Sequence, residues 1–445
     1  MKKWIALLLI LTLLLSGCSE QESSYTAEQE QNTEKGGMTE SKEVAAPEVC
    51  IEPVPWENAR VADFGARLLR ETMEEDKNTL ISPVSVLTAL SMTANGAEGD
   101  TLAQMETVLG QSKDALNAWY KYDTDKSGDY LHLANAIYLK DDGELTVKEE
   151  FLKVLEKWYE TGVYMTSFNE STLWEINSFV EDNTNGMVKN ILDKIPEEAV
   201  MYLVNALAFE AQWAIPYNEY EVSEQVFTTE DGREQTVELM YAEEYNAYVE
   251  NNLYTGFFKN YEGGRYAFAA LLPNEGVSVA EVAETLSGEL LAGMADSCWE
   301  GEVLTAMPKF QTEFDVEMSE VLKNMGMTDA FDDEKANFSG MGTYAGEDLF
   351  ISRVLHKTCI SVAEQGTRAG AATVVEMAPE AAMEPEEIKE VILNRPFLYM
   401  IWDRETNMPI FMGTFMDAQA EGTTVPAETD EIFYSPAEDP CMMEG

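Results

Sequence analysis

The chain has 445 residues, of which 45% are hydrophobic, and its 82 acidic and 29 basic residues give a formal net charge of −53. This apolar content suffices for a large packed core and is too high for a disordered protein. Because neutralising phosphate takes Lys and Arg, the charge argues against nucleic acid and anionic headgroups as partners. The acid either steers basic macromolecules toward the protein or only keeps the surface solvated.

The N-terminus has the pattern of a targeting segment. Two lysines precede an apolar run from Trp4 to Leu15, which is too short for a comfortable membrane span. The run ends in Leu15-Ser16-Gly17-Cys18, which resembles a bacterial lipoprotein cleavage site. On that resemblance residues 1–17 are a signal peptide, and Cys18 carries the lipid that anchors an exported protein to the bacterial cell surface. The alternative is an ordinary signal peptide with a chance cysteine.

Two polar, acidic segments flank the rest of the chain. Residues 18–55 are rich in Glu, Gln, Ser and Thr, which predicts a disordered acidic tether. Residues 418–445 are acidic as well and are predicted to form a C-terminal tail. The residues between them, 56–417, are predicted to form one large domain.

Cysteine spacing gives no sign of a metal or redox centre. Cys50, Cys298, Cys359 and Cys441 form no CxxC pair, so neither a metal nor another cofactor is expected. Cys359 lies in an apolar strand pattern and is predicted to be a core thiol. Cys50 and Cys441 flank the domain, and spacing alone leaves open whether they pair.

The predicted elements mix helices and strands without the alternation of a parallel sheet, which indicates an α+β fold. Ser82-Pro83 is typical of a helix start, with Ser as the cap and Pro in the first turn. The spacing of apolar residues predicts helices at 116–120, 151–159 and 176–180, and β-branched and aromatic residues predict strands at 201–209, 266–272 and 349–354.

Enzyme signatures are missing from the sequence. His132 and His356 are the two histidines of the chain, which leaves little for Ser–His or Cys–His catalysis. G-x-S-x-G, H-E-x-x-H and a phosphate-binding loop do not occur. We therefore expect no catalytic residues and no enzyme activity.

One long acidic loop stands out near the C-terminus. Residues 374–391 carry six acids and two prolines between two apolar segments, and so long a loop inside a compact domain usually has a function. The ten residues before Val374 read EQGTRAGAAT, and seven of them are Gly, Ala or Thr. They are either a flexible linker or a strand that must slip between two existing strands, with alternate side chains entering the core. Thr367, Ala369, Ala371 and Thr373 would then point inward, and Arg368 outward.

This segment resembles the hinge of the serpin family, which is close to E-E-G-T-E-A-A-A-A-T. The chain departs from that pattern at Gln365, Arg368 and Gly370, and it matches at Glu364, Gly366, Thr367, Ala369, Ala371, Ala372 and Thr373. Further matches run in order along about 360 residues: 78–110, Leu203-Val204-Asn205-Ala206, Met307-Pro308-Lys309-Phe310, Phe338-Ser339-Gly340-Met341, Asn394-Arg395-Pro396-Phe397 and Phe411-Met412-Gly413. The resemblance implies one large domain with a dominant central sheet, further sheets, surrounding helices and an exposed reactive-centre loop at about 366–393.

The resemblance also implies site residues and partners. Ser82, Ser85, Asn205 and His356 match a polar cluster where the central strands part, and Trp213 matches an aromatic at the top of the sheet. His356 could equally be an ordinary core histidine whose ring nitrogens are hydrogen-bonded. A serpin acts as a monomer on a target serine protease, which cleaves the reactive loop and is trapped as a covalent complex when the hinge enters the sheet.

The position of the reactive bond depends on the direction of counting. The family's spacing from Glu364 places it at Glu380-Ala381, with Ala382 and Met383 as alternatives, while counting back from Pro396 places it near Pro385. Glu380 would suit a glutamyl-specific protease, and the alternatives would suit elastase-like or subtilisin-like enzymes. A non-inhibitory serpin, acting as a cleavable substrate or a surface binding module, remains the second hypothesis.

Overall fold

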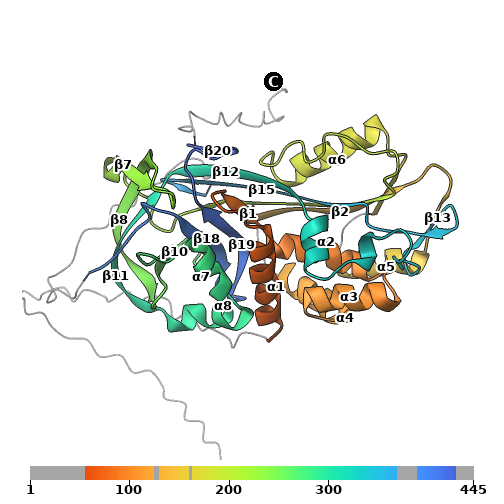
Figure 1. Ribbon diagram of the computed structural model, residues 1–445, viewed down its shortest axis with the longest axis horizontal. Coiled ribbons are helices and arrows are strands. Elements are labelled where there is room, and N and C mark those ends of the chain that lie inside the picture. Colours follow the sequence, from red (N-terminus) through yellow and green to blue (C-terminus); the bar gives the residue numbers. More distant parts are fainter. Residues whose placement is uncertain (1–55, 125–129, 160–162, 368–387, 427–445) are drawn as a thin grey trace, which may run out of the picture. The chain divides into compact units, whose positions relative to one another are not determined.

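The computed structural model describes residues 56–124, 130–159, 163–367 and 388–426 (Figure 1). Cys18, Cys50, Cys441, the predicted signal peptide and the predicted tether lie outside these residues, and so does most of the predicted tail. Within the described ranges the strands form two large sheets and one small one. The mixture of parallel and antiparallel strands with separate helices confirms the α+β class.

The central sheet has eight strands within the described residues. Its order is β20-β12-β15-β5-β2-β4, and two short strands, β16 and β6, lie beside β15. The neighbours β15 and β5 run parallel, whereas β12 and β2 on either side are antiparallel to them. The strands are β2 (Leu131–Lys140), β4 (Val163–Thr166), β5 (Met201–Phe209), β6 (Ala211–Gln212), β12 (Phe310–Glu317), β15 (Arg353–Ala363), β16 (Gly366–Thr367) and β20 (Thr423–Thr424).

The second large sheet has nine strands in the part of the chain that is described. Its order is β1-β19-β18-β10-β9-β8-β11-β17, with β7 paired to β8. These strands are β1 (Thr79–Ile81), β7 (Val222–Thr228), β8 (Glu234–Glu250), β9 (Tyr254–Asn260), β10 (Tyr266–Pro273), β11 (Trp299–Pro308), β17 (Lys389–Ile392), β18 (Phe397–Asp403) and β19 (Met408–Phe415). The small sheet consists of β3 (Leu145–Val147), β13 (Gly342–Tyr344) and β14 (Glu347–Asp348).

Helices cover both faces of the central sheet (Figure 1). One of them, α6, lies on one face over β2 and β5, and α2 packs on the opposite face against the same strands. The helices are α1 (Trp56–Thr72), α2 (Pro83–Ala94), α3 (Gly99–Leu109), α4 (Lys113–Thr124), α5 (Glu149–Trp158), α6 (Glu170–Asn183), α7 (Val279–Thr285), α8 (Gly288–Met294) and α9 (Ser319–Asn324).

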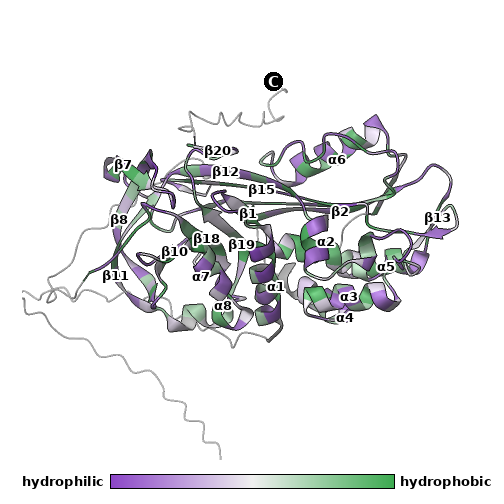
Figure 2. Cartoon of the chain, in the orientation of Figure 1, coloured by the Kyte–Doolittle hydropathy of each residue, from purple (hydrophilic) through white to green (hydrophobic). Residues whose placement is uncertain are grey.

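The helix α2 begins where the sequence predicts. Ser82 caps it by accepting a hydrogen bond from the backbone N–H of Ser85, and Pro83 occupies the first turn. Every residue from Pro83 to Ala94 is buried, and Figure 2 shows this helix as largely hydrophobic. A helix that is apolar on all sides belongs inside a large protein, which places α2 between the two sheets and the outer helices.

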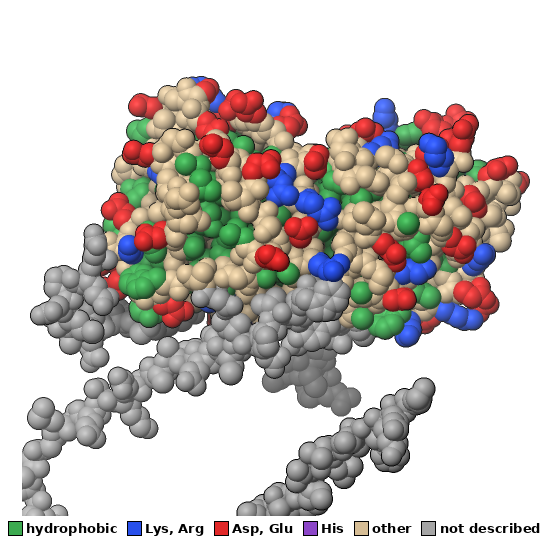
Figure 3. Space-filling model, turned by 60° about the horizontal axis from the view of Figure 1, so that its bottom comes forward, with side chains coloured by type: hydrophobic (Ala, Val, Ile, Leu, Met, Phe, Trp, Pro, Cys, Tyr) green, Lys and Arg blue, Asp and Glu red, His purple; other side chains and the backbone are tan. Residues whose placement is uncertain are grey.

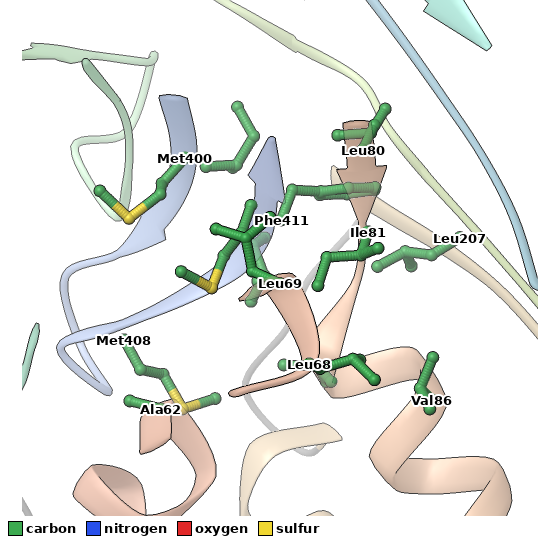
Figure 4. Close-up of a cluster of buried hydrophobic side chains, with 14 of the residues drawn as sticks. Ala62, Leu68, Leu69, Leu80, Ile81, Val86, Leu207, Met400, Met408 and Phe411 are labelled. Atoms are coloured by element: carbon green, nitrogen blue, oxygen red, sulfur yellow. The ribbon is translucent and has the colours of Figure 1, made fainter. Parts of the chain in front are cut away.

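The core forms where α1, α2, β1 and the second sheet meet the central sheet. Figure 4 shows Leu68 and Leu69 of α1 in one cluster with Ile81 and Phe411, with Leu207 of β5 close by. All five side chains are at most 1% exposed. Each such side chain contributes about 1.5–3 kcal/mol on burial, so this contact holds β1 and the second sheet firmly against the central sheet.

The structure confirms most predicted elements and corrects one. The helices predicted at 116–120, 151–159 and 176–180 lie within or one residue past α4, α5 and α6, and the strands at 201–209 and 266–272 are β5 and β10. The strand predicted at Leu349–Val354 begins only at Arg353. Leu349 and Ile351 are nonetheless buried, because this stretch packs onto the core as an irregular segment before the strand starts. Cys359 is a buried core residue of β15, as predicted.

Two predicted boundaries shift in the structure. The strand β17 covers residues 389–392, which the sequence assigned to the reactive-centre loop, because Val391 is buried beside β11. At the other end, Thr423 and Thr424 form β20 at the edge of the central sheet, so the fold extends beyond residue 417 into the predicted tail.

The described surface is acidic over a wide area. On the face shown in Figure 3, Asp and Glu side chains are scattered over the whole surface, and Lys and Arg lie among them. Among the described residues no group of His, Cys, Asp and Glu could hold a metal ion. None of the described helices is long and apolar enough to cross a membrane.

Candidate functional site

The central sheet forks at one end, between β15 and β5. The parallel pairing of these strands runs from Arg353 opposite Tyr202 to Cys359 opposite Ala208. Just beyond it, the chain leaves β15, turns, and returns as β16, which pairs antiparallel with β15 on one side and with β6 on the other. Thr367 therefore lies between Val362 and Ala211, so the predicted hinge begins as a third strand inside the sheet.

The fork requires a glycine at its first position. Gly366 has a φ of +153°, and a Cβ there would lie 2.2 Å from the carbonyl oxygen of Ala211. Every residue except glycine is thus excluded by both backbone conformation and space. The next residue, Thr367, is fully buried, and its Oγ1 lies 2.6 Å from the hydroxyl of Tyr261. This small polar side chain points into the core, as the sequence predicted for it.

Trp213 fastens the turn between β15 and β16. Its indole N–H donates to the carbonyl of Ala363 at 2.8 Å, and its backbone N–H donates to the carbonyl of Gln365 at 3.0 Å. The indole ring stacks on Tyr261 at 4.4 Å between centroids. The backbone N–H of Tyr217 adds a bond to the carbonyl of Glu364. Trp213, which the sequence placed at the top of the sheet, thus contacts the hinge itself.

Two ion pairs lie next to the hinge and to the aromatic residues that bind it, and the sequence predicted neither of them. Lys309 binds the carboxylate of Glu364 at 2.8 Å. Lys259 is 1% exposed and binds both carboxylate oxygens of Glu244, at 2.6 and 2.7 Å, while its ammonium lies 4.3 Å from the ring centroid of Tyr217. Burial lowers the pKa of Lys259, whereas the Glu244 carboxylate opposes that shift.

The predicted polar cluster lies farther from the fork, where β15 and β5 pair directly with each other. The backbone N–H of Ser82 donates to Nε2 of His356 at 3.1 Å, and Nδ1 of His356 lies 2.5 Å from Oδ1 of Asn205. The Ser82 hydroxyl donates to the carbonyl of Ile410 at 2.9 Å. Ser85 joins through its backbone N–H, which donates to the Ser82 hydroxyl. The structure therefore brings the four predicted residues together.

These contacts fix the protonation state of His356. Because Nε2 accepts a hydrogen bond, Nδ1 must carry the hydrogen and donate it to Asn205. A second proton on Nε2 would face the N–H of Ser82. The ring is completely buried, and burial alone lowers the pKa of His356 to about 3. The histidine is therefore neutral near pH 7.

Asn135 extends this cluster and was missed by the sequence analysis. Nδ2 of Asn205 donates to Oδ1 of Asn135 at 2.7 Å, so a row of polar side chains crosses β15, β5 and β2. A buried polar group costs about 1–3 kcal/mol when it is left unpaired, so the row must stay bonded. Only its place opposite Asn205 distinguishes Asn135 from other asparagines, and strand register is not visible in a sequence.

The two strands of the fork share one register throughout. Partners on β15 and β5 differ by 151 in residue number, and Val362 and Ala211, which both pair with Thr367, also differ by 151. A third strand can therefore lengthen between them if they move apart sideways, without sliding along each other. The rest of the predicted hinge (Ala369, Ala371, Ala372, Thr373) and the predicted reactive bond (Glu380, Ala381, with Ala382 and Met383) lie outside the described residues.

Comparisons with known proteins agree with this architecture. The family model of serpins, described as serine protease inhibitors, matches residues 59–418. A serpin-like protein of Thermococcus kodakarensis is 31% identical over 80% of this chain and 84% of its own length, and human neuroserpin is 27% identical over 82% and 92%. The native-state crystal structure of tengpin, a thermophilic serpin, superposes with a TM-score of 0.77 at 40% identity, covering 83% of this chain and 96% of that one.

The chain therefore belongs to the serpin family. Members of this family are in general inhibitors of serine proteases rather than catalysts. Tengpin in its latent state superposes less well, with a TM-score of 0.71 over 82% of this chain. The arrangement described here is thus closer to the native form of that relative than to its latent form.

Proposed function

We propose that this serpin inhibits serine proteases by a covalent suicide-substrate mechanism, in which the hinge enters the central sheet as a new strand. The observation that carries the proposal is the fork, where Gly366 and Thr367 already pair on both sides. Strand addition to a sheet and serpin loop insertion are general mechanisms, and the fork is the point at which insertion would continue here.

The shared register predicts where each further residue would lie. If the strand continues without a bulge, Thr373 would lie between His356 and Asn205, and Glu376 between Arg353 and Tyr202. The inward set would be Thr367, Ala369, Ala371 and Thr373, all small enough to enter a packed sheet. The hydroxyl of Thr373 could accept from His356 Nδ1 and donate to Asn205, so the polar row would stay bonded after the strands part.

The free energy of this insertion is large enough to matter. Nine more residues, from 368 to 376, would each gain ladder hydrogen bonds worth about 0.5–1.5 kcal/mol net, which sums to on the order of 10 kcal/mol. An ordinary domain is stable by about 5–15 kcal/mol, so this release can distort an attached protease.

The chemistry is that of an interrupted proteolysis. The protease serine attacks the carbonyl carbon of Glu380, its proton passes through the protease histidine to the leaving amine of Ala381, and an ester remains on Glu380. Insertion of the freed hinge then traps the protease before water cleaves the ester. Cleavage after Ala381, Ala382 or Met383 is the alternative, so glutamyl-specific, elastase-like and subtilisin-like enzymes are the proposed targets.

The location of the protein is part of the proposal. The lipoprotein-like N-terminus supports export and attachment to the bacterial cell surface through lipid on Cys18. Such a tether would let a monomeric domain meet proteases arriving from outside. Radiolabelled palmitate incorporated by the wild type and lost in Cys18→Ser would support this anchor, and equal labelling of both would contradict it.

Mixing the protein with elastase-like and glutamyl-specific proteases tests inhibition. We expect an SDS-resistant band at the summed mass of the two proteins, and mass spectrometry of the released fragment would locate the bond. Thr367→Arg should convert the inhibitor into a substrate, because the fully buried position cannot take a charge. The matched control is Thr285→Arg, on a helix away from the fork. Clean cleavage with full protease turnover would support the alternative, a non-inhibitory serpin.

A further inference from the structure

Glu210 lies at the mouth of the fork, directly before β6. The last hinge residue that the structure describes, Thr367, pairs with Ala211 of β6 and with Val362 of β15. In the same antiparallel register the next residue, Arg368, would lie beside Glu210. The described part of the hinge therefore ends one step short of an acidic side chain, and the first residue still to enter the sheet is a base.

Glu210 and Arg368 would face the same side of the central sheet. The residues before them, Phe209 and Thr367, are fully buried and both contact Tyr261 in the core. Because side chains alternate along a strand, Glu210 points to the opposite face, where its side chain is 32% exposed, and Arg368 would follow it there. Directly opposed residues on antiparallel strands have Cβ atoms about 4.5–5.5 Å apart, so an arginine and a glutamate at these positions are within reach of an ion pair.

Glu210 pairs with no Lys or Arg among the described residues. Its Oε2 accepts a hydrogen bond at 3.2 Å from Nδ2 of Asn185, which follows α6, and lies 3.8 Å from Nε2 of His132. That imidazole is charged only when it is protonated. The guanidinium of Arg368 would bring a permanent positive charge to this carboxylate.

The other end of the entering segment shows the same match with the charges reversed. Residues 368–376 read RAGAATVVE, so Arg368 and Glu376 are the two charged residues among them. They are eight positions apart and would lie on the same face of the sheet. In the same register Glu376 would lie beside Arg353, the first residue of β15. A base would thus meet an acid at one end of the segment, and an acid would meet a base at the other.

A shifted strand would lose these matches. A shift by one residue would turn Arg368 into the core, where an unpaired charge is costly. A shift two residues farther into the sheet would keep the faces but would place Arg368 between Cys359 and Ala208, which are at most 5% exposed and carry no acid. The two charge pairs therefore select one register of insertion.

We propose that Glu210 receives Arg368 as the hinge enters the sheet, and that this ion pair guides insertion in the correct register, with Glu376 and Arg353 as the second pair. The pair forms only when the strand enters, so it favours insertion over hydrolysis of the ester. Glu210 and Arg368 are positioning residues and touch no reacting atom. This inference rests on the proposed inhibitory function and names residues that make it efficient.

Variants of the full-length protein with exchanged charges test the pair. Arg368→Asp and Glu210→Arg each place like charges side by side, and the double variant restores the pair with its charges exchanged. Aspartate is chosen at position 368 because it creates no new glutamyl cleavage site. Glu284→Arg is the matched control, because this exposed side chain on α7 changes the net charge by the same amount as Glu210→Arg. Urea unfolding of the uncleaved proteins should be unchanged by Arg368→Asp, which separates guidance of insertion from a structural role.

The measured quantity is the ratio of cleaved, released inhibitor to SDS-resistant complex after reaction with elastase-like and glutamyl-specific proteases. This ratio compares hydrolysis of the ester with insertion of the hinge. We expect it to rise about fivefold in each single variant, to return to within about twofold of wild type in the double variant, and to stay at the wild-type value in Glu284→Arg. A fivefold change corresponds to about 1 kcal/mol, the upper end for a partly exposed ion pair.

Two outcomes would overturn the inference, and they differ in what else they remove. If wild type forms the complex and the ratio is the same in all variants, or the double variant is no better than the single ones, the ion pair does not guide insertion, and the proposed function stands. If wild type is only cleaved and forms no complex with either class of protease, the proposed function fails together with the inference.

Discussion

The buried His356 should make a measurable contribution to the loss of stability at low pH. In the folded state its pKa is lowered to about 3, against an ordinary value of 6.5, because the ring is fully buried. Below pH 6.5 the unfolded chain binds a proton that the folded protein does not, so stability falls as the pH falls from 6.5 toward 3. Through His356, the free energy of unfolding should be lower by about 1.4 kcal/mol at pH 5.5 than at pH 7.5, because pH 5.5 lies about one pH unit below the ordinary pKa of histidine.

Urea unfolding followed by tryptophan fluorescence at pH 7.5 and 5.5 measures this loss. His356→Gln removes the titrating group, so the difference between the two pH values should shrink by about 1.4 kcal/mol, although the variant is less stable at both. His132 is the other histidine of the chain and is only partly buried, so His132→Gln is the matched control for the loss of an imidazole. A His356→Gln protein with an undiminished pH dependence would refute the reasoning.

Three further substitutions have definite expected outcomes. Gly366→Ala should cost about 2 kcal/mol or more in urea unfolding, because its Cβ would meet the carbonyl of Ala211, while Gly264→Ala, with open space around it, should cost only about 1 kcal/mol. Equal losses would contradict the space argument. Lys259→Met should cost about 3–5 kcal/mol by leaving the Glu244 carboxylate unpaired, and adding Glu244→Leu should restore most of it. If the double variant is no more stable than Lys259→Met alone, the loss does not come from an unpaired Glu244 carboxylate. Thr373→Val should slow trapping of the protease in stopped-flow assays, because the polar row would lose its proposed new partner; an unchanged rate would count against that partner.

The sequence predicts the hinge and the polar cluster for different reasons. The composition of residues 364–373 also fits a flexible linker, and the small residues at every second position indicate a hinge only together with the resemblance to a family. Ser82 is predicted as a helix cap by its neighbour Pro83. The contact of His356 with Ser82 and Asn205 joins residues more than 150 positions apart, and the sequence predicts it only through resemblance to a family.

Other features of the site depend on packing and register, which local patterns do not contain. Asn135 joins the polar row because β2 pairs with β5 at that residue, and Lys259 is buried because Glu244 faces it from the neighbouring strand β8. An isolated lysine in a strand is normally predicted to be exposed. The strand β20 falls in the predicted C-terminal tail, because the acidic composition of residues 418–445 hides a two-residue strand.

The register of the inserted strand is the most direct test of the proposed mechanism. A crystal structure of the protein cleaved within residues 380–383 would provide it. We expect a continuous strand between β15 and β5, with Thr373 bonded to both His356 and Asn205 and with Glu376 opposite Arg353 and Tyr202. A cleaved protein in which β15 and β5 remain paired, with the hinge outside the sheet, would contradict the mechanism.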